Sequence, residues 1–116
     1  MKENPYNIQI QSYSMGGDMV FHVTGGAAHV GAIAVAYFNE TGKEIHEQLQ
    51  VFVHQLPHHK EGELAKECAE LAAKTLKVTS SVLMGIHIDH ATKEQIEDIV
   101  EYVRKSMKET LEAIRR

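Results

Sequence analysis

The stretch TGGAAHVGAIAVA, from Thr24 to Ala36, decides the fold of this 116-residue chain. Its second half, residues 30–36, is a run of small and β-branched apolar residues, too short to span a membrane and too apolar for an exposed edge. We expect it to form a central strand that is buried on at least one side. The Gly25-Gly26 pair before it can adopt backbone angles closed to other residues and leaves N–H groups uncovered. The pair therefore marks either a plain hairpin turn or a ligand site.

The composition predicts one domain, residues 1–116, because this length supplies one hydrophobic core without disulfides. The apolar fraction of 43% and the charged fraction of 24% are ordinary for a globular protein. A net charge of −4 disfavours sequence-independent binding to nucleic acid. The lone cysteine, Cys68, excludes an internal disulfide and a cysteine-based zinc site, and we expect it in the core. The polar N-terminus lacks a signal segment, which favours a cytoplasmic protein without a membrane anchor.

Hydrophobic periodicity predicts the element order ββββαβα. Alternating residues indicate strands at 5–14, 18–24, 29–38, 44–55 and 78–89. Helical spacing indicates a helix at 62–77 and a second from 93 to near the C-terminus, which a capping box of Thr92 and Gln95 introduces. The expected fold class is therefore α+β: a two-layer sandwich in which a mostly antiparallel five-stranded sheet carries two helices on one face.

Two helices on one face leave the other face of the sheet uncovered. By alternation, the polar residues expected there are Gln9, Gln11, His22, Thr24, His46, Gln48, Gln50, His54, His87 and Asp89. This face is open to three interpretations: a solvated surface, a surface for an organic ligand or partner, or the metal site of a small metal-dependent enzyme. Because no short motif such as H-E-x-x-H is present, a metal is not expected. Self-association would also bury this face, which suggests a homodimer.

Eight histidines are a high number for this length. His29 could hold a phosphate or carboxylate beside the glycine pair, or bond to the backbone. His58 and His59 fall in a predicted loop and are expected to be solvated. Asp89 could be a general base, orient His87, or satisfy N–H groups at the start of the last helix. No Ser–His–Asp order can be read in the sequence. A Walker sequence and a G-x-G-x-x-G motif are also absent, so nucleotide enzymes of those two standard kinds are not expected.

Three segments together resemble a known family: Thr24-Gly25-Gly26, the stretch HVGAIAVA at 29–36, and GIHID at 85–89 followed by Ala91-Thr92. They are similar to the small LpdD-type proteins, the D subunits of hydroxyarylic-acid (gallate- or vanillate-type) decarboxylase systems. In that family a TGG–HIGA–A stretch precedes G-I-H-x-D and a terminal helix. The length and the element order of this chain agree with the family as well.

The resemblance implies a non-enzymatic chaperone for prenylated flavin mononucleotide (prenylated FMN), which assists delivery of this flavin to a UbiD-type aromatic-acid decarboxylase subunit. It also implies a likeness to bacterial relatives of proteasome-assembly chaperones, and a ligand-free interaction module of that type stays open as an alternative. The cofactor-binding positions that the shared motifs imply are Thr24, Gly25, Gly26, His29, Gly31, Gly85, His87 and Asp89. The chain departs from the family pattern in the extra histidines His46, His54, His58 and His59, and no catalytic role carries over.

One placement of the flavin follows as a hypothesis. We expect its phosphate beside the Gly25-Gly26 turn, where backbone donors would face it. The flat ring would lie on small residues of the central strand, with Tyr13 or Phe52 as part of the wall. His87 and Asp89 would hold the ring edge or the partner.

Overall fold

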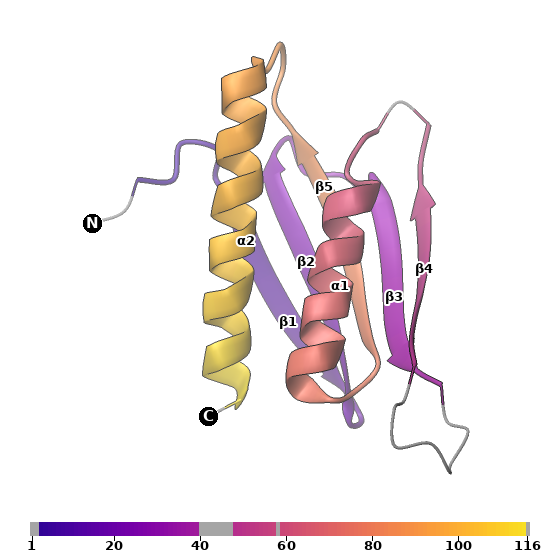
Figure 1. Ribbon diagram of the computed structural model, residues 1–116. Coiled ribbons are helices and arrows are strands. Elements are labelled where there is room, and N and C mark those ends of the chain that lie inside the picture. Colours follow the sequence, from indigo (N-terminus) through magenta and orange to yellow (C-terminus); the bar gives the residue numbers. More distant parts are fainter. Residues whose placement is uncertain (1–2, 40–47, 58, 116) are drawn as a thin grey trace.

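The computed structural model describes residues 3–39, 48–57 and 59–115. Five strands and two helices follow one another in the predicted order ββββαβα. The strands are β1 (Gln9–Met15), β2 (Asp18–Gly26), β3 (Ala32–Phe38), β4 (Leu49–Gln55) and β5 (Ser80–His87), and the helices are α1 (Gly62–Leu76) and α2 (Lys93–Arg115). Both helices lie on the same side of the sheet (Figure 1), so the predicted α+β sandwich of two layers is confirmed.

The five strands form one mixed sheet in the order β1-β2-β5-β3-β4. The pairs β1/β2, β5/β3 and β3/β4 are antiparallel, whereas β2 and β5 run parallel. A parallel pair needs a long connection, and here α1 belongs to the crossover that brings the chain back to the sheet. Because β5 enters between β2 and β3, β5 is the middle strand. The strand predicted at 29–38 is β3, which lies inside the sheet between β5 and β4 and is buried on one face, as predicted.

Several predicted boundaries also differ from the structure. Gly25-Gly26 is not a turn, because the pairing of β2 with β5 continues through Gly26, which lies opposite His87. The loop falls at residues 27–31 instead, and β3 begins only at Ala32. β1 begins at Gln9 rather than at residue 5, since Asn7 has a φ of 53° that interrupts an extended chain.

Part of one predicted strand and most of one predicted turn fall outside the described residues. The fourth strand, expected at 44–55, is described from Leu49 to Gln55, and residues 44–47 lie outside that part of the chain. The turn expected at 39–43 is described only at Asn39. The described portion of β4 pairs with β3 as the alternation requires.

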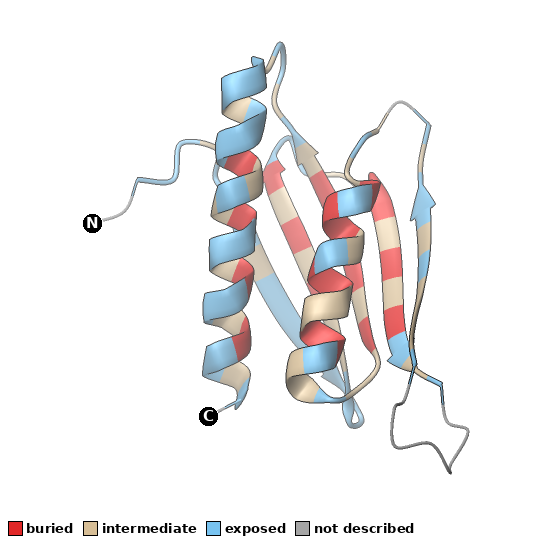
Figure 2. Ribbon diagram, viewed as in Figure 1, coloured by how far each residue is buried: buried red, intermediate tan, exposed pale blue. Residues whose placement is uncertain are grey.

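The core lies between the sheet and the two helices. Figure 2 shows the buried residues concentrated in β2, β5 and β3 beneath the helices, while β1 and β4 at the two edges are more exposed. Ala32, Ala34 and Ala36 are fully buried, and these small side chains let α1 approach β3 closely. Cys68 on α1 is 2% exposed, which confirms it as a core residue. Burial raises the pKa of its thiol to about 12.

Local hydrogen bonds fix the position of α2. In the predicted capping box, the N–H of Thr92 donates to Gln95 Oε1 (2.8 Å) and the N–H of Gln95 donates to Thr92 Oγ1 (3.1 Å). Further along, the Arg104 guanidinium donates two hydrogen bonds to the Glu67 carboxylate on α1 (2.7 and 2.8 Å). Neither described helix is both long and apolar enough to cross a membrane.

The face of the sheet opposite the helices is less polar than predicted. The predicted polar residues Gln9, Gln11, His22, Thr24, Gln50 and His54 are on this side, as expected. Val20, Val35, Leu83 and Phe52 alternate onto the same side. Phe52 is 63% exposed. Of the predicted polar set, His46 lies outside the described residues and Asp89 follows the end of β5. None of the five strands, as described, contains a lysine, arginine or glutamate.

Candidate functional site

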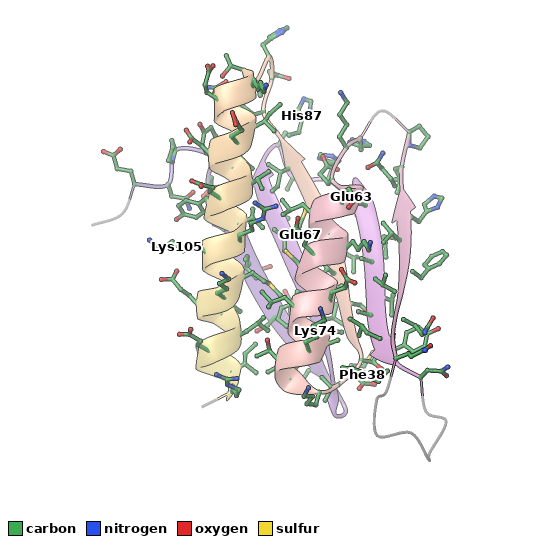
Figure 3. The ribbon with its side chains drawn as sticks, in the orientation of Figure 1. Phe38, Glu63, Glu67, Lys74, His87 and Lys105 are labelled. Carbon is green, nitrogen blue, oxygen red and sulfur yellow. The ribbon has the colours of Figure 1, made fainter. Side chains whose placement is uncertain are left out.

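The glycine and histidine segments of the sequence meet at one end of the sheet. The loop at 27–31, the connection at 56–61 from β4 to α1, and the chain that follows β5 come together there. Figure 3 shows His87 at the same end of the molecule as Glu63, in the first turn of α1, with Phe38 and Lys74 at the opposite end. The parallel strands β2 and β5 both terminate here, and the carboxyl ends of parallel strands are a usual place for ligands.

Gly85 makes room for the backbone of His29. A Cβ atom at Gly85 would overlap the carbonyl group of His29, so only glycine permits this approach. Next to it, the N–H of Gly31 donates to the carbonyl oxygen of Met84 (2.8 Å). The loop at 27–31 therefore lies directly on β5, and the His29 side chain is held near the end of that strand.

Gly26 makes a second close backbone contact, with His87. It has a φ of 60°, and a Cβ atom there would overlap the carbonyl oxygen of His87. The N–H of Gly26 donates to the Tyr6 carbonyl (2.8 Å), and the N–H of Ala27 donates to the His87 carbonyl (3.1 Å). These two donors are occupied. The expectation that the glycine pair leaves uncovered N–H groups for a phosphate was therefore wrong at Gly26, because the Tyr6 carbonyl accepts from this group.

Gly31 makes room for the carboxylate of Glu61. A Cβ atom at Gly31 would overlap Glu61 Oε2, and the carbonyl oxygen of Gly31 accepts a hydrogen bond from the N–H of Leu56 (2.9 Å). Glu61 immediately precedes α1, and its side chain is only 15% exposed. Among the described residues, Glu61 Oε2 has no hydrogen-bond partner. A buried carboxylate oxygen without a donor is costly and indicates that a proton donor or a cation belongs there.

His29 and His59 face each other beside that carboxylate. His29 Nε2 and His59 Nδ1 are 3.1 Å apart, and the two ring centroids are 4.5 Å apart. His59 Nδ1 also lies 3.8 Å from Glu61 Oε2. The His59 side chain is 26% exposed, so the prediction that it is solvated was wrong. His58, for which the same was predicted, lies outside the described residues.

His87 and Asp89 form a hydrogen-bonded pair at the edge of this group. His87 Nε2 is 2.8 Å from Asp89 Oδ1, and the side chains are 53% and 84% exposed. The rings of His29 and His87 meet edge to face, with centroids 6.0 Å apart. Asp89 therefore orients His87, which is one of the three roles that the sequence left open for it.

A cavity of about 230 Å³ opens beside these residues, between the sheet and the first turns of both helices. Its lining is mostly apolar, with three polar side chains, and consists of Lys60, Glu61, Leu64, Ile86, His87, Ile88, Ala91, Ile96, Ile99 and Val100. Two larger grooves, of about 690 and 360 Å³, follow α2. They are lined largely by charged side chains and contain no glycine or histidine of the sequence motifs. The smaller cavity is therefore the better candidate for an organic ligand.

The structure brings most of the predicted site residues to this end of the sheet. Gly26, His29, Gly31, Gly85, His87 and Asp89 gather there, and Thr24 and Gly25 pair with Gly85 and Ile86 without lining the cavity. Sequence reasoning missed Lys60 and Glu61 and set His59 aside. The signal that could have found them is the triplet His59-Lys60-Glu61, which places a metal-ligating or acid–base pair two residues apart just before a helix.

Comparison with known proteins identifies the family. The chain matches the model of the prenylated flavin chaperone LpdD-like domain over residues 2–115. A search of curated proteins found none that matches. The family match spans nearly the whole chain and includes every segment that forms the site at the ends of β2 and β5. The protein belongs to the LpdD-like family of prenylated flavin chaperones.

Proposed function

We propose that this protein binds prenylated FMN and delivers it to a UbiD-type aromatic-acid decarboxylase, without catalysing a reaction itself. The observation that carries the proposal is the apolar cavity of about 230 Å³ whose polar rim comes from the segments that match the family. Family membership supports the class of cofactor. The partner enzyme follows from the LpdD resemblance.

The size and chemistry of the cavity suit one part of a flavin. Cavities of about 150 Å³ accept benzene, whereas sites that enclose whole drug-sized ligands start at about 300 Å³. A volume of about 230 Å³ therefore accommodates the apolar carbon atoms that prenylation adds, together with the adjoining ring edge. The rest of the flavin would lie outside, across the rim. Such partial enclosure suits a carrier that has to release its ligand.

The rim offers charged and polar anchors for the exposed part. Lys60 is a cation at the mouth of the cavity and is placed to pair with a phosphate, a task that the occupied N–H of Gly26 cannot perform. His87 also lines the mouth and, held by Asp89, can hydrogen-bond to a ring carbonyl. We therefore move the proposed flavin site from the open sheet face to the helix side of the sheet.

Binding of FMN and prenylated FMN to the untagged protein, measured separately by calorimetry, tests the first half of the proposal. Each buried CH₂ group contributes about 0.8 kcal/mol, so burial of only two of the added carbons already gives a preference of about tenfold for the prenylated form, and burial of more gives a larger one. The variant Ala91→Phe places a ring in the cavity and should lose that preference. Its control, Ala113→Phe, makes the same change at an exposed position of α2. Equal affinities for both flavins in the unmodified protein would contradict the proposal.

Delivery is tested with apo-decarboxylase of the UbiD type. Addition of the chaperone loaded with prenylated FMN should activate the enzyme faster than free prenylated FMN at the same concentration, and the Ala91→Phe variant should not. If the chaperone binds the decarboxylase tightly but does not speed its activation by prenylated FMN, the ligand-free interaction module becomes the better interpretation. If the flavin binds but no decarboxylase responds, only the delivery step fails.

The uncharged strands support the homodimer suggested by the sequence. Edge strands usually carry charges that prevent pairing, but β1 and the described part of β4 contain none, and Phe52 on β4 is 63% exposed. A second copy of the chain is the simplest occupant of such a surface. Sedimentation should show a dimer that Phe52→Lys converts to a monomer, while the control Ala113→Lys, on the helix layer, leaves it intact. A monomeric wild-type protein would contradict this part.

A further inference from the structure

We propose that His29, His59 and Glu61 form a binding site for a divalent first-row transition-metal ion at the mouth of the cavity. The three residues come from the loop at 27–31 and from the connection before α1, and one ligating atom of each lies within 4.8 Å of the others. The site does not depend on flavin binding. It lies in loops, whereas the metal site considered as one interpretation of the sequence would lie on the strands of the open face.

The distances between the ligating atoms suit an ion at their centre. Zinc–nitrogen and zinc–oxygen bonds are about 2.0–2.2 Å long, so two ligands of a tetrahedral zinc ion lie roughly 3.3–3.5 Å apart. His29 Nε2 and His59 Nδ1 are 3.1 Å apart, and His59 Nδ1 and Glu61 Oε2 are 3.8 Å apart. These two distances differ from the tetrahedral separation by only a few tenths of an ångström, and the third pair of ligating atoms lies within 4.8 Å.

Counting protons leads to the same conclusion. His29 Nδ1 lies 3.0 Å from the carbonyl oxygen of Ala27. A carbonyl oxygen can only accept, so Nδ1 carries a hydrogen, and in the neutral imidazole Nε2 then presents a lone pair. The nitrogen facing it, His59 Nδ1, has at most one hydrogen to share between His29 Nε2 and Glu61 Oε2. At least one acceptor is then left without a donor, and Glu61 Oε2 has none among the described residues. A cation satisfies all three groups at once.

The surroundings of the cluster have the features of a built site. A metal-bound histidine typically donates its other ring N–H to a backbone carbonyl, which fixes its tautomer and orientation, and the bond from His29 to Ala27 does so. Glycine at position 31 leaves the space that the Glu61 carboxylate occupies. Gly85 sets the backbone of His29 on β5. Two of the glycines shared with the family motif thus hold ligating residues in place.

The ligand types define the class of metal. Two imidazole nitrogens and one carboxylate oxygen suit zinc, iron, cobalt and nickel better than magnesium or calcium, which prefer oxygen alone. Three protein ligands leave at least one coordination position for an exogenous group. Glu61 belongs both to the cluster and to the lining of the cavity, so that position is available to a ligand lying across the rim.

Zinc titration of chelator-treated, untagged protein tests the site in the absence of any flavin. Calorimetry should show one zinc ion per chain, and His59→Ala and Glu61→Gln should each weaken binding by on the order of 100-fold. Zinc at a hundredfold excess over its Kd should raise the Tm of the wild-type protein by on the order of 10 °C, and should do so for neither variant.

Two matched histidine variants separate this site from adventitious binding. His54→Ala removes an exposed histidine on β4, and His90→Ala removes an exposed one before α2, so both should bind zinc as the wild type does. Equal zinc affinity in wild type, His59→Ala and Glu61→Gln, with all three folded by circular dichroism, would overturn the proposal, as would the absence of one-to-one binding. Because no flavin is present, either result leaves the proposed chaperone function untouched.

Discussion

The carbonyl group of His29 lies against the Cα atom of Gly85, at the place where any other residue would carry its Cβ atom. This contact joins the loop at 27–31 to the middle strand of the sheet. It explains why glycine stands in the GIHID segment without reference to a ligand. The backbone of His29 is then positioned by this contact, and its ring is oriented by the bond to the Ala27 carbonyl.

The first prediction concerns that contact. Gly85→Ala should destabilise the protein by about 1–3 kcal/mol, because the added methyl group meets backbone atoms that cannot rotate away. The control is Gly17→Ala, since a Cβ atom at Gly17 meets nothing within 4 Å and should change stability by less than about 0.5 kcal/mol. Urea unfolding of the three proteins gives both values. Equal midpoints for Gly85→Ala and wild type would refute the close contact.

The second prediction concerns the start of α2. Thr92→Ala removes the side-chain oxygen that accepts the hydrogen bond of the Gln95 N–H and should cost about 1 kcal/mol. Thr110→Ala is the matched control: the Thr110 hydroxyl donates to the Ser106 carbonyl within the helix, and alanine is the better helix former there. In thermal unfolding, the Tm of Thr92→Ala should therefore be well below the Tm of Thr110→Ala. The reverse order would contradict the capping box.

The third prediction concerns the reactivity of Cys68. Burial raises the pKa of its thiol to about 12, so at pH 8 the thiolate is absent and the sulfur is out of reach of solvent. A thiol reagent such as DTNB should label the native protein only at the rate of unfolding, and should label it at once in urea. Rapid labelling of one thiol per native chain would show that Cys68 is not in the core.

The fourth prediction concerns pH and the ion pair between the helices. The hydrogen bonds from Arg104 hold the pKa of the Glu67 carboxyl below its ordinary value of 4.5. A lowered pKa in the folded state means that the pair stabilises the protein above pH 4.5, and that this contribution is lost as the pH falls through the lowered value. The stability difference between wild type and Glu67→Gln should therefore be constant from pH 7 to 5 and shrink towards pH 3.

The side chains of Arg104 and Glu67 are both more than a third exposed. The stability difference between wild type and Glu67→Gln at neutral pH should therefore be small and should decrease with salt. Glu97→Gln, which removes an exposed carboxylate elsewhere on α2, serves as the control. Urea midpoints at pH 7, 5, 4 and 3 give the profile. A gap between wild type and Glu67→Gln that widens on acidification would contradict the assignment.

Much of the fold could be predicted from the sequence because its signals are local. The alternation in β2, the alanines of β3 and the capping box at Thr92 each depend on residues a few positions apart. The position of β5 could not be predicted in this way. Its apolar pattern shows that it is buried but does not show that it separates β2 from β3, because that depends on which partners the crossover reaches.

The candidate site was only half predictable for the same reason. His29 and His87 stand out beside glycines in the family motifs, so the sequence points to them. His59 and Glu61 stand in a loop with no periodicity, and they matter only because the chain brings them against His29, thirty residues away from His59. Whether a loop histidine is solvated or packed depends on tertiary contacts, which spacing does not record.

The place of β5 in the middle of the sheet has a consequence for biosynthesis. Until residues 80–87 have left the ribosome, β2 and β3 have no strand between them, and the chain can form only the two separate hairpins β1/β2 and β3/β4. Insertion of β5 closes these non-local pairings and is expected to be the slow step of folding. A nascent or truncated chain that lacks β5 therefore has no site at the ends of β2 and β5, because the loop at 27–31 then has no strand to pack on.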